Sequence, residues 1–140
     1  MAKHNAASIR TRTPNGTYGV LNKVHGKAVM AATPANDVVH VLRLDQGCTF
    51  YGLTAHYGAM GAGTGLKVGI SYPNPLNDAS LVDDDDVFLT VADTSSAGKA
   101  VWDGVPFTTE ALVEITVTVT GAAATGDVTV IPEYVYRGAA

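Results

Sequence analysis

Two segments near the C-terminal end alternate apolar and polar residues with a period of two. The apolar positions in residues 111–121 are Val113, Ile115, Val117 and Val119, and those in residues 126–138 are Val128, Val130, Tyr134 and Tyr136. A period of two places side chains on one face of a β-strand. Glu114 and the intervening threonines of the first segment would then form a solvated face. Each strand must bury its apolar face against a second layer, so the alternation predicts packed sheets.

Turn-forming residues divide the rest of the chain into further short apolar runs. We expect additional strands over residues 24–33, 38–44, 49–57, 65–72 and 101–107. Residues 83–98 (DDDDVFLTVADTSSAG) predict one short helix, because acids favour a first helical turn and Val87, Phe88 and Val91 have helical spacing. Pro132 lacks an N–H group and is expected at a sheet edge or bulge. About eight strands predict an all-β antiparallel β-sandwich of the jelly-roll type, and a Greek-key barrel has the same signature.

The distribution of charge separates an N-terminal arm from a body. The first 36 residues contain five basic residues and no acidic one, and the remainder has thirteen acids and four bases, so +5 and −9 give the net −4. Residues 1–20 are polar and aperiodic, which predicts an extended basic arm followed by a single β-sandwich domain over 21–140. Such an arm suits an acidic partner surface. It lacks the dense basic clusters and interleaved aromatics typical of nucleic-acid binding, so nucleic acid is not the expected partner.

Composition limits where the chain is expected to act and which cysteine-based sites it can contain. The single cysteine, Cys48, excludes an internal disulfide and a cysteine-rich zinc site. No apolar run is long enough for a membrane-spanning helix, and the N-terminus lacks the apolar centre of a secretion signal, so we expect a chain made and used without export, with no membrane partner.

No motif in the chain predicts catalysis, a metal or a cofactor. The glycine-rich segment HYGAMGAGTGLKVGI, residues 56–70, has the P-loop spacing between Gly58 and Gly63, but Thr64 replaces the lysine and a strand follows, so we interpret it as a turn. The run Asp83 to Asp86 lacks the glycine and glutamate of an EF-hand and is interpreted as a solvated helix start. The four dispersed histidines form no metal-binding pair, and no nucleophile elbow is present.

Three segments resemble the capsid decoration, or cement, proteins of tailed phages. They are residues 35–70, residues 83–98 and the closing pair of alternating strands, which together span residues 35–136. The pattern is most similar to the jelly-roll cement proteins of the Bordetella short-tailed phage type. The resemblance implies a non-enzymatic virion protein on the outer surface of an icosahedral head, made in the bacterial cytoplasm. It implies binding to a major capsid protein of the HK97-type fold, stabilisation of contacts between its subunits, and a homodimer in preference to a trimer.

The residues expected to make these contacts follow from the charge and strand patterns. The capsid-binding arm is predicted to comprise Lys3, Arg10, Arg12, Lys23 and Lys27. Self-association is predicted near the last strand, at Val128, Val130, Tyr134 and Tyr136. A carbohydrate-binding sandwich or virion-surface adhesin is the alternative function. Its sugar-stacking platform would use the six tyrosines and Trp102.

Overall fold

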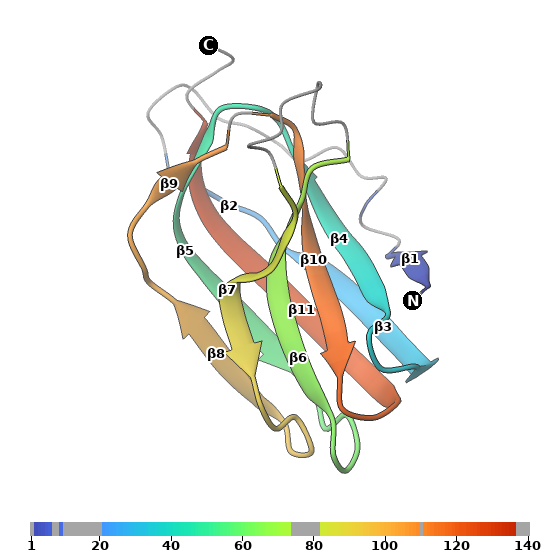
Figure 1. Cartoon of the computed structure of the whole chain (residues 1–140). Helices are drawn as coiled ribbons and strands as arrows, with labels where there is room; N and C mark the ends of the chain where they lie inside the picture. The colour runs from blue at the N-terminus through green and yellow to red at the C-terminus, as the bar shows by residue number, and fades with distance from the viewer. Residues whose placement is uncertain (1, 7–8, 10–20, 74–81, 110, 137–140) are drawn as a thin grey trace.

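Two β-sheets packed face to face form the structure, a computed structural model that describes residues 2–6, 9, 21–73, 82–109 and 111–136 (Figure 1). Sheet A contains, in spatial order, β1 (Lys3–Asn5), β4 (Val38–Leu44), β10 (Val113–Thr120), β6 (Gly65–Ser71) and β7 (Asp84–Val91). Sheet B has the order β2 (Leu21–Lys23), β11 (Ala124–Tyr136), β5 (Cys48–Tyr57) and β8 (Gly98–Trp102). Two further strands, β3 (Gly26–Thr33) and β9 (Phe107–Thr108), pair with β11 and β5 respectively.

The chain passes between the two sheets at most of its connections. It runs from β3 in sheet B to β4 in sheet A, back to β5, on to β6 and β7 in sheet A, and then to β8, β10 and β11 in turn. All strand pairs are antiparallel except β1 with β4. The eight strands of five or more residues are therefore split between two open sheets, and this order agrees with the jelly-roll arrangement.

The hydrophobic core lies between the sheets. The predicted inward residues of the last two long strands are buried there: Val113, Ile115, Val117, Val119, Val128, Val130 and Tyr134. Phe50 of sheet B meets Phe88 of sheet A with ring centroids 5.4 Å apart, so the two layers are in direct contact. The two-residue period thus identified the core side of these strands correctly.

The predicted short helix was wrong, because residues 84–91 form strand β7, and no α-helix occurs in the described ranges. β7 pairs with β6 through Val68 with Leu89 and Ile70 with Asp84, so residues 85–88 stand opposite Gly69 alone. This bulge removes the regular alternation of a strand and leaves Val87, Phe88 and Val91 at a spacing that resembles a helix. Gly69 allows the bulge, since a Cβ there would lie 2.6 Å from the Asp85 Cα.

The outward-facing side chains of β10 are also less exposed to solvent than its glutamate and threonines predict. Glu114, Thr116 and Thr118 are buried, although the alternation placed them on a solvated face. β10 is the central strand of sheet A, with β4 and β6 on either side, and Thr118 lies in register between Val38 and Lys67. Short side chains between longer neighbours are shielded even on an outward face.

Pro132 lies in an interior strand, beside a bulge. It pairs in register with Leu53 of β5, next to a shift between Glu133 and Tyr134. On the other side of β11, β3 pairs with residues up to Val130 and β2 with residues from Glu133 onward. Pro132 therefore occupies the gap between two short partner strands, where no ladder hydrogen bond needs its missing N–H. Among the described residues, no helix is long and apolar enough to cross a bilayer.

Candidate interaction surfaces

The outer face of sheet B carries most of the exposed large apolar side chains of the described residues. Six such side chains are exposed, and four lie on this sheet: Leu21 of β2, Val29 of β3, Tyr51 of β5 and Val101 of β8. Their exposed fractions run from 39% to 67%. Val101 pairs with Thr54, which pairs with Ile131, so two apolar side chains flank a threonine across the middle of the sheet. We call this surface the outer B face, and apolar surface gathered on one face is typical of an interaction site.

Two of the predicted arm lysines lie on the outer B face and not in the arm. Lys23 of β2 forms an ion pair with Glu133 at 3.2 Å, and Lys27 of β3 pairs with Asp127 at 3.0 Å. Both partners belong to β11, the neighbouring strand. Exposed pairs of this kind contribute about 0–1 kcal/mol, so they neutralise the face more than they stabilise the fold. Of the other arm residues, Lys3 lies in the exposed strand β1, and Arg10 and Arg12 fall outside the described residues.

The residues predicted for self-association face the interior. Val128, Val130 and Tyr134 are fully buried, and Tyr136 is half-buried against the core. Burial also raises the pKa of the Tyr134 hydroxyl to about 12. Any contact that β11 makes with another molecule must use its opposite side, where Ile131 is partly exposed.

The outer face of sheet A contains a buried charge network that the sequence did not reveal. The Glu114 carboxylate bonds His40 Nδ1 at 2.8 Å and accepts hydrogen bonds from Arg43 Nε and Nη2 at 3.1 and 2.8 Å. Glu114 and His40 are buried, and the half-exposed Arg43 guanidinium closes the network toward solvent. Desolvation lowers the pKa of His40 and outweighs the opposing attraction of Glu114. The network links β4 to β10 and has a structural role.

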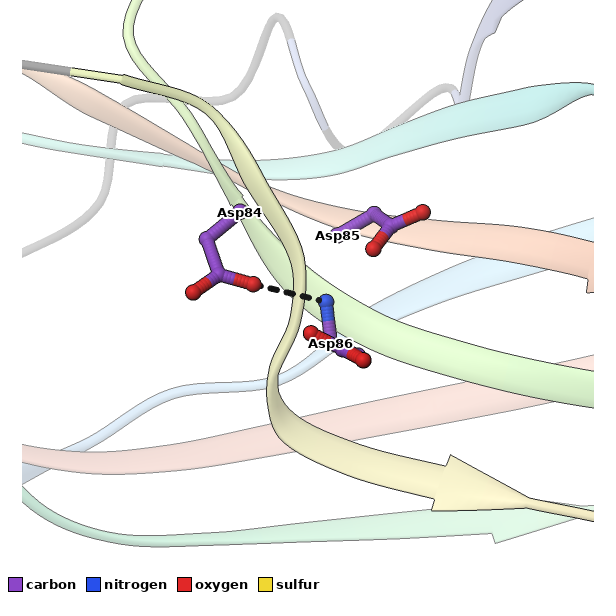
Figure 2. Close-up of side chains that lie close together, drawn as sticks. All are labelled: Asp84, Asp85 and Asp86. Carbon is purple, nitrogen blue, oxygen red and sulfur yellow. Dashed lines mark hydrogen bonds between the residues drawn. The ribbon is translucent and has the colours of Figure 1, made fainter.

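Beside this network a hollow of about 550 Å³ opens between β1 and the start of β7. Ala2 and Lys3 line one side, and Asp83, Asp84 and Asp85 line the other. Figure 2 shows Asp84, Asp85 and Asp86, of which Asp84 accepts a hydrogen bond from the Asp86 N–H at 3.2 Å. Their carboxylate oxygens lie within 4.8 Å of one another and are exposed, the one group in the described ranges with metal-ligand proximity. The acid run therefore begins an exposed strand, whereas the sequence predicted a helix start.

The glycine-rich segment connects β5 to β6 as a tight, anchored turn. Gly61 and Gly63 have φ values of +116° and +75°, a region that favours glycine. Met60 N–H donates to the Thr94 carbonyl at 2.8 Å, and the Thr64 and Thr94 hydroxyls are 2.7 Å apart. These bonds fix the turn to the β7–β8 connection. A strand follows the turn, so it offers no helix N-terminus to a phosphate, in agreement with the interpretation as a turn.

The aromatic residues within the described ranges do not form an exposed platform for sugar. Trp102 packs edge-on against Phe88 with ring centroids 5.1 Å apart, and Phe107 lies 5.7 Å from Trp102. Phe50 and Tyr134 extend this cluster between the sheets. Of the described tyrosines, Tyr51 alone is exposed. Of the residues that the sequence offered as a stacking surface, Trp102 and Tyr134 belong to this cluster, and Tyr18 lies outside the described residues.

The fold and these surfaces define a class: an open, two-sheet antiparallel β-sandwich. Glu114 and His40 form a buried polar pair on sheet A, and large apolar side chains are exposed on the outer face of sheet B. No protein-family model matches the sequence, and no curated protein does.

Solved structures with a similar fold come from phage capsids. A chain of the capsid of Ralstonia phage GP4 superposes with a TM-score of 0.75 at 16% identity, over 99% of this chain and 100% of that one. A chain of the cyanophage Pam1 capsid asymmetric unit has a TM-score of 0.63 at 24% identity, covering 94% and 96%. A chain of the Helicobacter pylori bacteriophage KHP30 capsid has a TM-score of 0.62 at 15% identity, covering 87% and 92%. At these identities the similarity establishes a shared fold.

Proposed function

We propose that this protein is a structural component of a phage virion that binds the outside of an icosahedral head. There it stabilises contacts between subunits of a major capsid protein of the HK97-type fold, as a decoration or cement protein does. The observation that carries the proposal is the agreement of the fold with a chain of a phage capsid over essentially the full length of both chains. A protein of this kind acts by binding, and no catalytic step is part of the proposal.

The outer B face is the surface that fits this role. Fully burying an exposed valine or leucine contributes about 1.5–3 kcal/mol, and Leu21, Val29 and Val101 are each more than half exposed on this face. Two lysines of this face, Lys23 and Lys27, are already paired with Glu133 and Asp127, so docking requires no new partner for either of them. We propose that the outer B face contacts the capsid and that the basic N-terminal residues, Lys3, Arg10 and Arg12, add electrostatic attraction to an acidic capsid surface.

A homodimer fits the proposed role better than a trimer. In a two-fold dimer the same patch contacts itself, and the ion pairs that Lys23 and Lys27 make within each chain lower the repulsion between the two copies. The outward side of β11, with Ile131 at its centre, is the part of the last strand that can reach a second copy, and it belongs to the outer B face, so a second copy and the capsid would compete for it. Many copies on one shell would add avidity, because each bridges subunits that would otherwise separate.

Co-sedimentation with undecorated heads tests the proposal. Saturable pelleting that a soluble glycan does not inhibit, together with heads that resist heat better, is the expected result. Pelleting that glycan abolishes would favour the adhesin, and no pelleting at all would refute the capsid role.

A matched pair of variants tests the surface. Val101→Asp places a charge on the outer B face, whereas Val105→Asp places one on the β8–β9 connection, where the side chain is more exposed, 86% against 55%. We expect the first to weaken binding at least about tenfold, since a buried unpaired charge costs more than 1.4 kcal/mol, and the second to leave it unchanged. Equal binding by both variants would assign docking to another surface.

A further inference from the structure

Strand β1 is attached to the sandwich mainly through its backbone. It pairs in parallel with β4, with Lys3, His4 and Asn5 in register with Val38, Val39 and His40. Val38 N–H donates to the Ala2 carbonyl at 3.2 Å, and Ala6 N–H donates to the His40 carbonyl at 3.1 Å. β1 therefore covers the otherwise open edge of β4 in sheet A (Figure 1).

One carboxylate fixes the beginning of this segment. Asp37, which is 5% exposed, accepts a hydrogen bond from the Ala2 N–H at 2.9 Å and bonds His4 Nε2 at 2.8 Å. The hydrogen bond from Ala2, followed by that from His4, lowers the pKa of the Asp37 carboxyl. The carboxylate thus recognises two groups of the same short segment, the second and fourth residues of the chain.

The side chains of β1 bury little surface. All three of its residues are exposed, and hollows flank it on both sides. The larger hollow lies next to Ala2 and Lys3, and the second, of about 310 Å³, lies next to His4 and Asn5 and reaches β3. In the described part of this segment, apolar anchoring is limited to Ala6 and Ile9. A segment held by few buried contacts opens at low free-energy cost.

We propose that the edge of β4, together with Asp37, is a strand-acceptor site, and that in assemblies its occupant is the N-terminal segment of a second copy of this chain. The site recognises the chain's own residues 2–6, so an exchanged strand reproduces every hydrogen bond of the unexchanged one, which makes such a swap inexpensive. Fifteen residues separate Asn5 from Leu21, enough to span up to about 50 Å.

Charge favours the same occupant. The first 36 residues carry +5 and the remainder −9, so the N-terminal region of one copy is attracted to the body of another. At the acceptor site this attraction has a local counterpart, since the far side of the larger hollow carries Asp83, Asp84 and Asp85. An uncovered β4 edge would be open to indiscriminate pairing, which a swapped strand prevents as well as a local one. The inference does not depend on the proposed virion role.

Two variants of the full chain, each with one cysteine added to Cys48, test the exchange. Lys3→Cys and Val38→Cys place thiols at register partners that line the same hollow. The variants, one carrying a size tag, are mixed, unfolded, refolded together and oxidised. We expect a disulfide-linked heterodimer at least about fivefold above a control mixture of Val38→Cys with Lys99→Cys, whose thiol lies on β8. The buried Cys48 does not compete, because its pKa is raised to about 12.

Two more variants complete the test: one chain that carries both Lys3→Cys and Val38→Cys, and Asp37→Asn, which removes the carboxylate that holds residues 2 and 4. If strands do not exchange, the Lys3→Cys/Val38→Cys double variant will oxidise wholly at monomer mass and the mixture will give no heterodimer above the control, which overturns the proposal. Cross-linking of Val38→Cys to capsid protein on heads, and not to a second copy, also overturns it. Asp37→Asn should lower the heterodimer yield severalfold and speed hydrogen exchange at Val38 and Ala6, while amides of β10 remain protected.

Discussion

Replacing Gly69 with alanine should destabilise the protein through a collision with the backbone of β7. The added Cβ would point at the carbonyl of Asp84 and at the main chain of Asp85, whose Cα would lie 2.6 Å away. Carbon atoms in favourable contact are about 3.5–4.0 Å apart, so β7 would have to retreat by roughly 1 Å. The obstacle is main chain of the strand that carries Phe88 into the core, and it cannot rotate aside as a flexible side chain can.

Gly58 supplies a matched control for the same substitution. A Cβ there would meet only the backbone O and N of Asp127, at 3.9 and 4.0 Å, which is ordinary contact distance. The Gly58 N–H donates to the Asp127 carbonyl at 3.0 Å, a bond that alanine retains. Gly58→Ala should therefore leave stability unchanged or raise it by about 0.4–1 kcal/mol, because alanine restricts the unfolded chain.

The expected magnitude for Gly69→Ala is a loss of about 3 kcal/mol, the upper end of the cost of overpacking. In a domain of this size that corresponds to a fall in melting temperature of roughly 10 °C. Urea unfolding followed by the fluorescence of Trp102 measures both variants against the parent. A Gly69→Ala variant within about 0.5 kcal/mol of the parent would refute the close approach of β7 to β6. Equal losses in both variants would show that the cost is a general effect of alanine and not the collision.

Three further predictions follow from the core and the buried network. The pKa of His40 is lowered from 6.5 in the folded protein, so the unfolded chain binds this proton more tightly. The stability that neutral His40 contributes is therefore present above about pH 6.5 and lost as pH falls through the folded pKa. Urea unfolding between pH 8 and pH 5 should show a fall in the free energy of unfolding that is smaller in His40→Gln. Phe88→Ala should cost about 3–5 kcal/mol in the same assay, whereas Val105→Ala, at a side chain that is 86% exposed, should change stability by less than about 0.5 kcal/mol. The Cys48 thiol should react with a thiol reagent only after unfolding, since it is buried with a pKa raised to about 12, and rapid labelling of the native protein would contradict its placement in the core.

Much of the fold could be predicted from local pattern. Predicted strands over residues 38–44, 49–57 and 65–72 match β4, β5 and β6 to within one residue at each end. These strands could be delimited because turn-forming residues flank their apolar runs, among them Pro34 to Asp37, Asp45 to Gly47 and the glycine-rich segment before Gly65. β7 could not be recognised, because its bulge opposite Gly69 disrupts the alternation. The short strands β1, β2 and β9 carry too few residues for any period to appear.

The candidate surfaces were less accessible to sequence reasoning. Lys23 and Lys27 look like part of a basic arm in the sequence, but pairing of β2 and β3 with β11 brings them beside Glu133 and Asp127, more than 90 residues later in the chain. The outer B face was missed for a related reason. An exposed valine such as Val101 has the same pattern as a buried one until the partner sheet is known.

The sequence by itself determined that most of this chain forms strands, several of them with an apolar face that needs a second layer, because a two-residue period places alternate side chains on one side of a strand; it left a sandwich and a Greek-key barrel open. It also determined the uneven charge of the two parts of the chain. Only the tertiary structure decided which outward-facing side chains are buried and which lysines form ion pairs. It also decided that Asp37 holds β1 on the edge of β4. Those features arise from pairings between strands far apart in the sequence, and local periodicity carries no information about which strands become neighbours.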